Sequence, residues 1–361
     1  MNGYIRWGGA VVVLVAAVVL AAGACGDDSS GSGGANAGPT SGPTSGPTSG
    51  SGAGEPAPSC GDDSPAALGA CVEQSRYLAD LTTMEGARAP SDPLHAQTRQ
   101  LCADRFAEHG FDVELHDYGT GINVIGVKPG ASDDRVLVSA HYDGTPNCPG
   151  ADDNASGVAG VLETARVLGP QPAFDRTLVV ACWDEEELGL VGSRAYAERA
   201  ATNGEAIVGH YVYEMIGYFD DTPGAQSLPF GFNLVFPEET KIVEDNEYRG
   251  DFLAIIGDES FAGGMAALDG YCDVFGIKGL VLTLNADQKN DPLYGDLQRS
   301  DHAPFWEQNF PALHMTDTSE FRYAAYHCGE GDDVKENLDH AFATGIIRAT
   351  TAATAELLGM P

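Results

Sequence analysis

Residues 135–144 read RVLVSAHYDG, and residues 151–168 read ADDNASGVAGVLETARVL. The apolar run in the first segment predicts a buried strand, and His141 comes directly after it, at the end where open α/β sheets bind ligands. In the second segment Asp153 precedes residues with the spacing of one helix face, namely Val158, Val161, Leu162, Ala165 and Leu168. We therefore expect His141 and Asp153 to meet in one crevice, with the Asp153 carboxylate beside a helix amino terminus.

The rest of the chain alternates strand and helix patterns. Strands are predicted at 111–115, 122–127, 135–140, 178–183, 207–216, 252–256, 279–284 and 311–315. Helices are predicted at 71–81, 93–109, 156–168, 191–201 and 260–272, and residues 219–248 are expected to form a loop or small insertion. A last helix should open with Asp333 and Glu336 in capping-box spacing and end near Gly359. This βαβ order predicts an α/β fold, a three-layer α/β/α sandwich with a mixed, largely parallel central sheet.

Residues 1–25 have the pattern of a bacterial lipoprotein signal peptide. They hold one charge, Arg6, then an uncharged run too short to cross a bilayer, and then small residues that lead into Cys25. We expect Cys25 to be lipidated and the protein to be an exported cell-surface or periplasmic lipoprotein; ordinary secretion is the alternative. Residues 26–59, rich in Gly, Ser, Pro and Thr, predict a disordered linker, and residues 60–361 are long enough for one catalytic domain.

The charge of the chain limits its partners. It carries 53 acidic against 19 basic residues, a formal charge of −34. Such a surface repels phosphate backbones and anionic lipid headgroups. We therefore expect no nucleic-acid partner, and contact with a membrane only through the lipid anchor.

Acidic residues follow two further predicted strands. Glu185, Glu186 and Glu187 come after the strand at 178–183, and Glu214 comes after the strand residues His210-Tyr211-Val212-Tyr213. Glutamates so close together call for cations nearby. Because the ends of parallel strands share one sheet edge, these carboxylates should lie near His141. Carboxylate and imidazole donors without cysteine favour zinc or a similar divalent ion.

Several sequence blocks together resemble a known enzyme family. They are His-x-Asp at 141–143, Asp-Asn-Ala-Ser-Gly at 153–157, Glu-Glu-Leu-Gly-Leu-x-Gly-Ser at 186–193, RSDHAPF at 299–305 and Tyr-His at 326–327. From about residue 77 onward the chain is similar to the co-catalytic di-zinc aminopeptidases, clan MH exopeptidases of the secreted bacterial leucine-aminopeptidase type. The resemblance implies two Zn²⁺ per chain and a peptide substrate with a free amino terminus.

The resemblance also implies the metal ligands. His141 and Glu214 would bind the first metal, Glu187 and His327 the second, and Asp153 would bridge both. The family commonly has aspartate where this chain has Glu214, and the extra methylene alters the reach of that carboxylate.

Two further residues would serve the reaction without binding metal. Glu186 would be the general base that takes a proton from the attacking water and returns it to the leaving amine. Asp143 would orient the imidazole of His141. His302 is the rival of His327 for the last ligand position, and otherwise we expect it to line the substrate pocket.

Two other functions remain open at the level of sequence. The same site would serve a peptidase or amidase of other specificity, such as a carboxypeptidase-like or glutaminyl-cyclase-like enzyme. A surface lipoprotein that binds without catalysis is the alternative from another class, although Glu186 and every expected type of metal ligand are present.

The cysteines suggest a cross-link at this site. Without Cys25, seven cysteines remain in an oxidising compartment, so at least one lacks an intramolecular partner. Cys182, inside a predicted buried strand, is the natural free thiol. Cys148 lies between His141 and Asp153, and Cys328 follows His327. If those three ligands reach one metal pair, as the resemblance implies, a disulfide between Cys148 and Cys328 is expected.

Overall fold

A computed structural model describes residues 59–360 of the chain. The predicted signal peptide with Cys25, and the predicted linker up to residue 58, lie outside the described residues. Within residues 59–360, no helix has both the length and the apolar character needed to cross a lipid bilayer.

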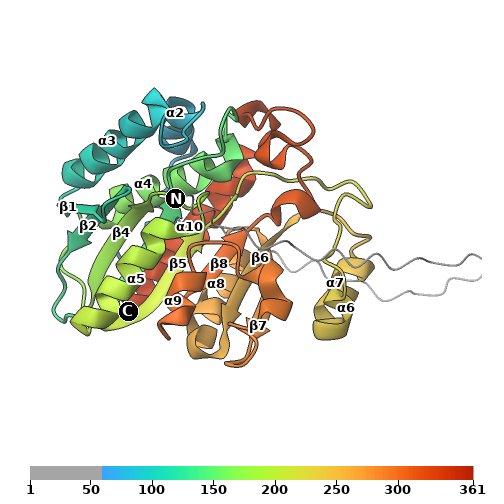
Figure 1. The fold of residues 1–361 in the computed structure, drawn as a ribbon. Coiled ribbons are helices and arrows are strands. Elements are labelled where there is room, and N and C mark those ends of the chain that lie inside the picture. The colour runs from blue at the N-terminus through green and yellow to red at the C-terminus, as the bar shows by residue number, and fades with distance from the viewer. Residues whose placement is uncertain (1–58, 361) are drawn as a thin grey trace, which may run out of the picture. The chain divides into compact units, whose positions relative to one another are not determined.

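Eight strands form one mixed sheet in the order β1-β2-β4-β3-β5-β8-β6-β7 (Figure 1). Their bounds are β1 Asp112–Asp117, β2 Ile122–Lys128, β3 Arg135–His141, β4 Thr177–Trp183, β5 Ile207–Tyr213, β6 Phe252–Asp258, β7 Lys278–Leu284 and β8 Leu313–Thr316. The central strands β4, β3, β5 and β8 are parallel, whereas β1 and β2 at one end, and the β6–β8 pair near the other, are antiparallel. The predicted largely parallel sheet is confirmed.

Helices cover both faces of the sheet, which completes the predicted three layers. The bounds are α1 Pro65–Gly69, α2 Gln74–Met84, α3 Pro93–Glu108, α4 Gly157–Leu168, α5 Val191–Asn203, α6 Phe232–Val235, α7 Pro237–Asp245, α8 Ala262–Val274, α9 Ala303–Glu307 and α10 His340–Leu357. Side chains alternate along the strands: Val136 and Val138 pack toward α4 and α10, and Leu137 between them packs toward α5 and α9. Both faces are therefore buried, as the continuous apolar strands require.

The predicted start of the last helix was wrong, and the predicted loop or small insertion at 219–248 contains short helices. The last helix begins at His340, where the Asp339 side chain accepts hydrogen bonds from the backbone of Ala341 and Phe342. Leu338 is extended, so the helix does not reach back to the capping-box pair at 333 and 336. Residues 219–248 also contain regular structure, the short helices α6 and α7, which Figure 1 shows beyond the β6–β7 end of the sheet.

Candidate metal centre and reaction cavity

The carboxyl ends of β3, β4 and β5 bring the candidate ligands together. His141 is the last residue of β3 and is fully buried. Glu186 and Glu187 lie in the turn after β4, and Glu214 directly follows β5. Asp153 lies in the turn before α4, and its peptide bond to the next residue is cis. Because β4, β3 and β5 are adjacent and parallel, residues far apart in the sequence meet at one sheet edge.

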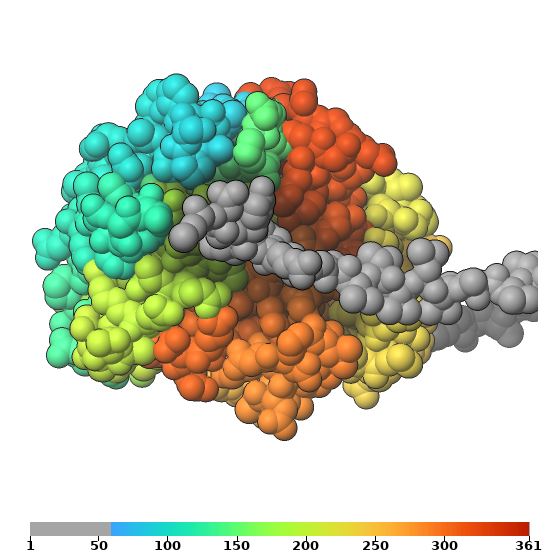
Figure 2. Space-filling model, in the orientation of Figure 1, coloured from blue at the N-terminus to red at the C-terminus, as the bar shows by residue number. Residues whose placement is uncertain are grey.

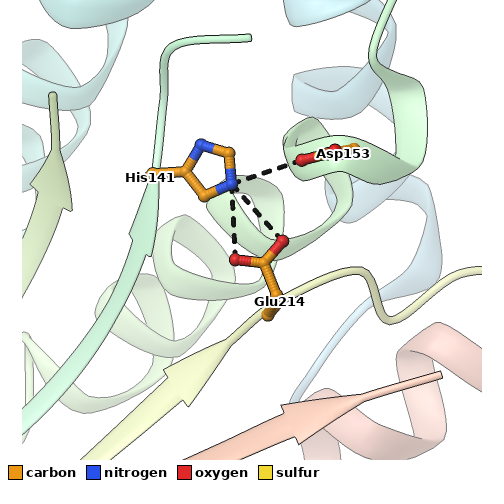
Figure 3. Close-up of side chains that lie close together, drawn as sticks. All are labelled: His141, Asp153 and Glu214. Atoms are coloured by element: carbon orange, nitrogen blue, oxygen red, sulfur yellow. Dashed lines mark hydrogen bonds and ion pairs between the residues drawn. The ribbon is translucent and has the colours of Figure 1, made fainter. Parts of the chain in front are cut away.

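Two groups of candidate ligands share one carboxylate. In the first, His141 Nε2 lies 3.3 Å from Asp153 Oδ1 and 3.3–3.4 Å from both Glu214 oxygens (Figure 3). In the second, His327 Nε2 lies 3.0 Å from Asp153 Oδ2 and 3.3 Å from Glu187 Oε2. Each set places one atom per residue within 4.8 Å of the others. The two oxygens of Asp153 thus face different histidines, an arrangement that suits a carboxylate bridging two cations.

Glu186 lies beside these groups and belongs to neither of them. Its Oε2 is 3.9 Å from His141 Nε2. Asp143 holds this turn, because one carboxylate oxygen accepts from the backbone N–H of Glu186 at 3.0 Å and the other from that of Glu187 at 3.2 Å. The first of these oxygens also faces His141 Nδ1 at 3.3 Å. Asp143 therefore orients the imidazole and, in addition, the loop that carries both glutamates.

The site opens into a cavity of about 790 Å³, called here the site cavity. Asp153, Glu186, Glu214 and His327 line one end. The floor is one face of the β8–β6–β7 part of the sheet, with Thr316, His314, Ala254, Ile256, Leu280 and Leu282. In the view of Figure 2, the surface is hollowed between orange and red segments, which lie late in the sequence. A polar, acidic end thus adjoins a largely apolar pocket, as in many small-ligand sites.

Part of the sequence that carries this site matches a known protein family. The model described as peptidase family M28 matches residues 123–231, a segment that holds His141, Asp153, Glu186, Glu187 and Glu214. The match covers 109 of the 361 residues, so it shows similarity to this family for that segment.

Two curated relatives match parts of this chain. Uncharacterized protein YfbL of Escherichia coli K12 is 31% identical over 206 residues, which cover 53% of this chain and 58% of YfbL. Probable lipoprotein aminopeptidase LpqL of Mycobacterium tuberculosis is 42% identical over 114 residues, 30% of this chain and 23% of LpqL. The matches thus span less than two thirds of either relative.

Several solved structures share the fold of this chain. The LapA aminopeptidase of Legionella pneumophila superposes with a TM-score of 0.61 at 18% identity, over 81% of this chain and 73% of LapA. Porphyromonas gingivalis glutaminyl cyclase gives 0.57 at 15% identity, over 80% of this chain and 99% of the cyclase. At such identities the likeness is one of fold.

The structure separates the two rival histidines. His327 faces Asp153 and Glu187, whereas His302 is fully buried and donates from Nε2 to the Leu297 carbonyl at 2.9 Å. The His302 ring packs against Trp306 and His314, and His302 does not line the site cavity. The expectation that His302 lines the substrate pocket was therefore wrong. His314, to which the sequence analysis assigned no role, lines it instead.

Several supporting residues escaped the sequence analysis. Asp333 accepts hydrogen bonds from the backbone N–H groups of Asp152 and Asp153 at 3.0 Å. The fully buried Arg88 donates to the carbonyls of Gly150 and Asp153. Asp333 matched a helix cap equally well in the sequence, and nothing local marks Arg88, because both act on a turn distant along the chain.

Three hydrogen bonds fix the Glu214 side of the site. Ser300 Oγ donates to Glu214 Oε2 at 2.7 Å inside the protein. The Asn154 side chain accepts from the Met215 N–H at 3.2 Å and donates to the Tyr213 carbonyl at 3.0 Å. Asn154 thereby ties the turn carrying Asp153 to the end of β5. The Asn154 side chain is fully buried, so a glycan has no room there.

Burial and neighbouring charges set the protonation of the site. Burial lowers the pKa of His327, but hydrogen bonds to Asp153 and Glu187 outweigh it and raise that pKa to about 10. Burial also opposes the charge on His141, yet its carboxylate neighbours raise its pKa well above the usual value. Burial raises the pKa of Glu186, and the nearby Glu214 carboxylate adds to this effect. Without cations, buried carboxylates therefore depend on protonated histidines for balance.

The two groups of candidate ligands, one around His141 and one around His327, fit divalent metal ions. Each offers one imidazole and two carboxylates, donors that suit zinc. Glu187 Oε1 is buried without a hydrogen-bond partner in the described structure, and such an atom needs a ligand. An ion in each group would accept electron pairs from the carboxylate oxygens and the imidazole nitrogen of that group.

A disulfide joins the two ligand-bearing loops. Cys148 and Cys328 are bonded, with their Cα atoms 5.7 Å apart, as predicted. Cys60 and Cys71 form a second disulfide that the sequence analysis did not assign. Within residues 59–360, Cys102 and Cys272 are free and buried, as is Cys182, the predicted free thiol.

Removing the Cys148–Cys328 bond should loosen metal binding. The double variant Cys148→Ser/Cys328→Ser is expected to lower metal content and to lose up to about 4 kcal/mol of stability, because a bond across a long loop restricts the unfolded chain most. Cys60→Ser/Cys71→Ser, which opens a loop with a sequence separation of 11, is the control and should lose less stability and no metal. Elemental analysis and thermal unfolding measure both; equal metal loss in the two variants would contradict the role.

Proposed function

We propose that this chain is a zinc-dependent aminopeptidase of peptidase family M28 that uses two metal ions. The observation that carries the proposal is the position of Asp153, whose two oxygens face His141 and His327 at 3.3 and 3.0 Å. One carboxylate between two histidine-carboxylate groups suits two metals close enough to act on one bond.

The residues around these groups have separate tasks. Zinc ions bound there would polarise the substrate carbonyl and lower the pKa of the attacking water. Glu186, not engaged as a ligand, accepts the proton of that water and passes it to the leaving amine. A carboxylate that binds neither metal is free to take up and give back a proton. Asp143 keeps Glu186 in place through the backbone.

The substrate proposed is a peptide with a free amino terminus. Carboxylates at the metal end of the site cavity suit an ammonium group. Relatives named as aminopeptidases support this reaction, LpqL of Mycobacterium tuberculosis and YwaD of Bacillus subtilis among them.

The test is metal analysis together with a panel of aminoacyl chromogenic substrates, before and after chelation. Hydrolysis that is lost on chelation and restored by zinc is expected for free amino termini, and none for blocked ones. Cleavage of blocked peptides, or cyclisation of amino-terminal glutamine, would assign the site to the other specificities that this fold carries. Binding of peptides without turnover would point to the non-catalytic lipoprotein.

We further propose export as a lipoprotein, anchored through Cys25. The support is the signal-peptide pattern of residues 1–25, followed by the Gly/Ser/Pro/Thr-rich residues 26–59. Labelling with a fatty-acid analogue should mark the wild type and leave Cys25→Ser unlabelled. A wild type that is released unlabelled into the medium would mean ordinary secretion.

Shortening Glu214 tests the one departure from the family pattern. Both Glu214 oxygens reach His141 Nε2 at similar distances, and Ser300 holds one of them. Glu214→Asp withdraws the carboxylate by one methylene and breaks the Ser300 hydrogen bond. We expect affinity for the first metal to fall about tenfold or more, the order seen when ligand support is lost. Competition with a chelator measures this, and an unchanged affinity would show that the backbone adapts.

Zinc uptake should release protons. The raised pKa values of His141 and His327 keep both imidazoles protonated at pH 7 in the metal-free protein, so zinc must displace a proton from each. We expect release of at least about two protons per chain at pH 7, and affinity that increases with pH until His327 titrates, near its pKa of about 10. Calorimetry in buffers of different ionisation enthalpy measures the release; none at pH 7 would contradict it.

A further inference from the structure

The most exposed large apolar side chains of the described residues gather around one hollow. Phe230, Leu234 and Leu293 are 108%, 83% and 79% exposed, higher than any other large apolar residue in the described part of the chain. All three line a surface depression of about 770 Å³, called here the outer hollow, formed by α6 and the turn around residue 293. Side chains gathered in this way usually mark a binding surface.

The outer hollow continues the site cavity. Pro229, Phe232, Asp296 and Leu297 line both. The site cavity and the outer hollow therefore adjoin along these residues, and a ligand longer than the site cavity can reach the outer hollow.

The two hollows differ in depth. The floor of the site cavity consists of sheet residues such as Ile256, Leu280 and Leu282, each at most 4% exposed. This closed end suits the side chain of the first residue of a substrate. The outer hollow has exposed walls, which suits the part of a peptide beyond the scissile bond.

We propose that the outer hollow binds apolar side chains of the peptide substrate downstream of the scissile bond. The inference rests on the proposed aminopeptidase function and narrows its substrates to peptides with apolar residues after the first. A lipid surface fits less well, because a chain of formal charge −34 is repelled by anionic headgroups.

The triple variant Phe230→Ser/Leu234→Ser/Leu293→Ser tests the proposal, since exposed positions tolerate polar residues. Three substrates are compared: leucyl-p-nitroanilide, the tetrapeptide Leu-Phe-Leu-Phe and the tetrapeptide Leu-Ser-Gly-Ser. The apolar tetrapeptide should lose about tenfold in kcat/KM, chiefly through KM, the order expected when apolar contact is lost. The other two substrates should stay within about twofold of wild type.

The control is Leu115→Ser, an exposed apolar position on β1 that lines neither hollow. It should leave all three substrates unchanged. Equal losses on all substrates, or no loss on the apolar tetrapeptide, would overturn the proposal. A wild-type dimer that the triple variant dissociates would instead assign the outer hollow to self-association. Failure of the wild type to cleave leucyl-p-nitroanilide and both peptides would remove the proposed function itself, and the inference with it.

Discussion

Glu186→Gln is expected to retain near-native metal content and to lose at least ~100-fold in kcat, the order expected on removal of a general base. The side chain lies 3.9 Å from His141 Nε2 and in neither metal-binding group. The amide keeps the shape of the carboxylate and cannot accept the proton. Because its backbone N–H still bonds to Asp143, the loop should stay in place.

Glu185→Gln is the matched control, one residue earlier in the same turn. The Glu185 carboxylate accepts from the Thr120 hydroxyl at 2.7 Å and belongs to neither metal-binding group. Its amide variant should keep both metal content and turnover. Steady-state kinetics with elemental analysis separates the two glutamates, and retained activity in Glu186→Gln would assign the base to another residue.

His327→Ala should remove the second metal, the second large effect. The variant deletes the imidazole from the group with Asp153 and Glu187, which leaves carboxylates only. Loss of a residue that only supports a metal ligand raises the Kd of a metal by ~10–100-fold. Loss of the ligand His327 itself should raise the Kd of the second metal by more than that. We expect metal content to fall from two ions toward one per chain, and turnover to fall with it.

His302→Ala is the comparison that decides between the rival histidines. His302 is fully buried against Trp306 and His314, so its loss should lower the unfolding temperature through lost packing. Metal content should remain at the wild-type value. A variant of His302 that loses metal, beside one of His327 that keeps it, would reverse the assignment.

Apolar periodicity was enough to predict the sheet and the edge where the ligands meet. The strands that precede His141 and Glu186 are apolar and bounded by polar turns, so their ends can be read from local sequence. The predicted strand at 207–216 extends past Glu214, whereas β5 ends at Tyr213. Parallel strands then bring these ends together whatever the loops do. The strand ends therefore allowed the candidate metal-binding group around His141, and the turn with the candidate base Glu186, to be predicted with little tertiary information.

The sequence by itself thus determined the α/β layers, the residue types of the site and the cysteines near it. Only the tertiary structure placed His327, and not His302, beside Asp153 and Glu187, since both histidines lie in irregular segments whose direction no periodicity encodes. It also decided that Asp333 holds the turn of Asp153 instead of capping a helix, because that carboxylate bonds to backbone 180 residues away. The outer hollow likewise depends on segments distant in sequence, and burial against such segments is a property of the folded chain alone.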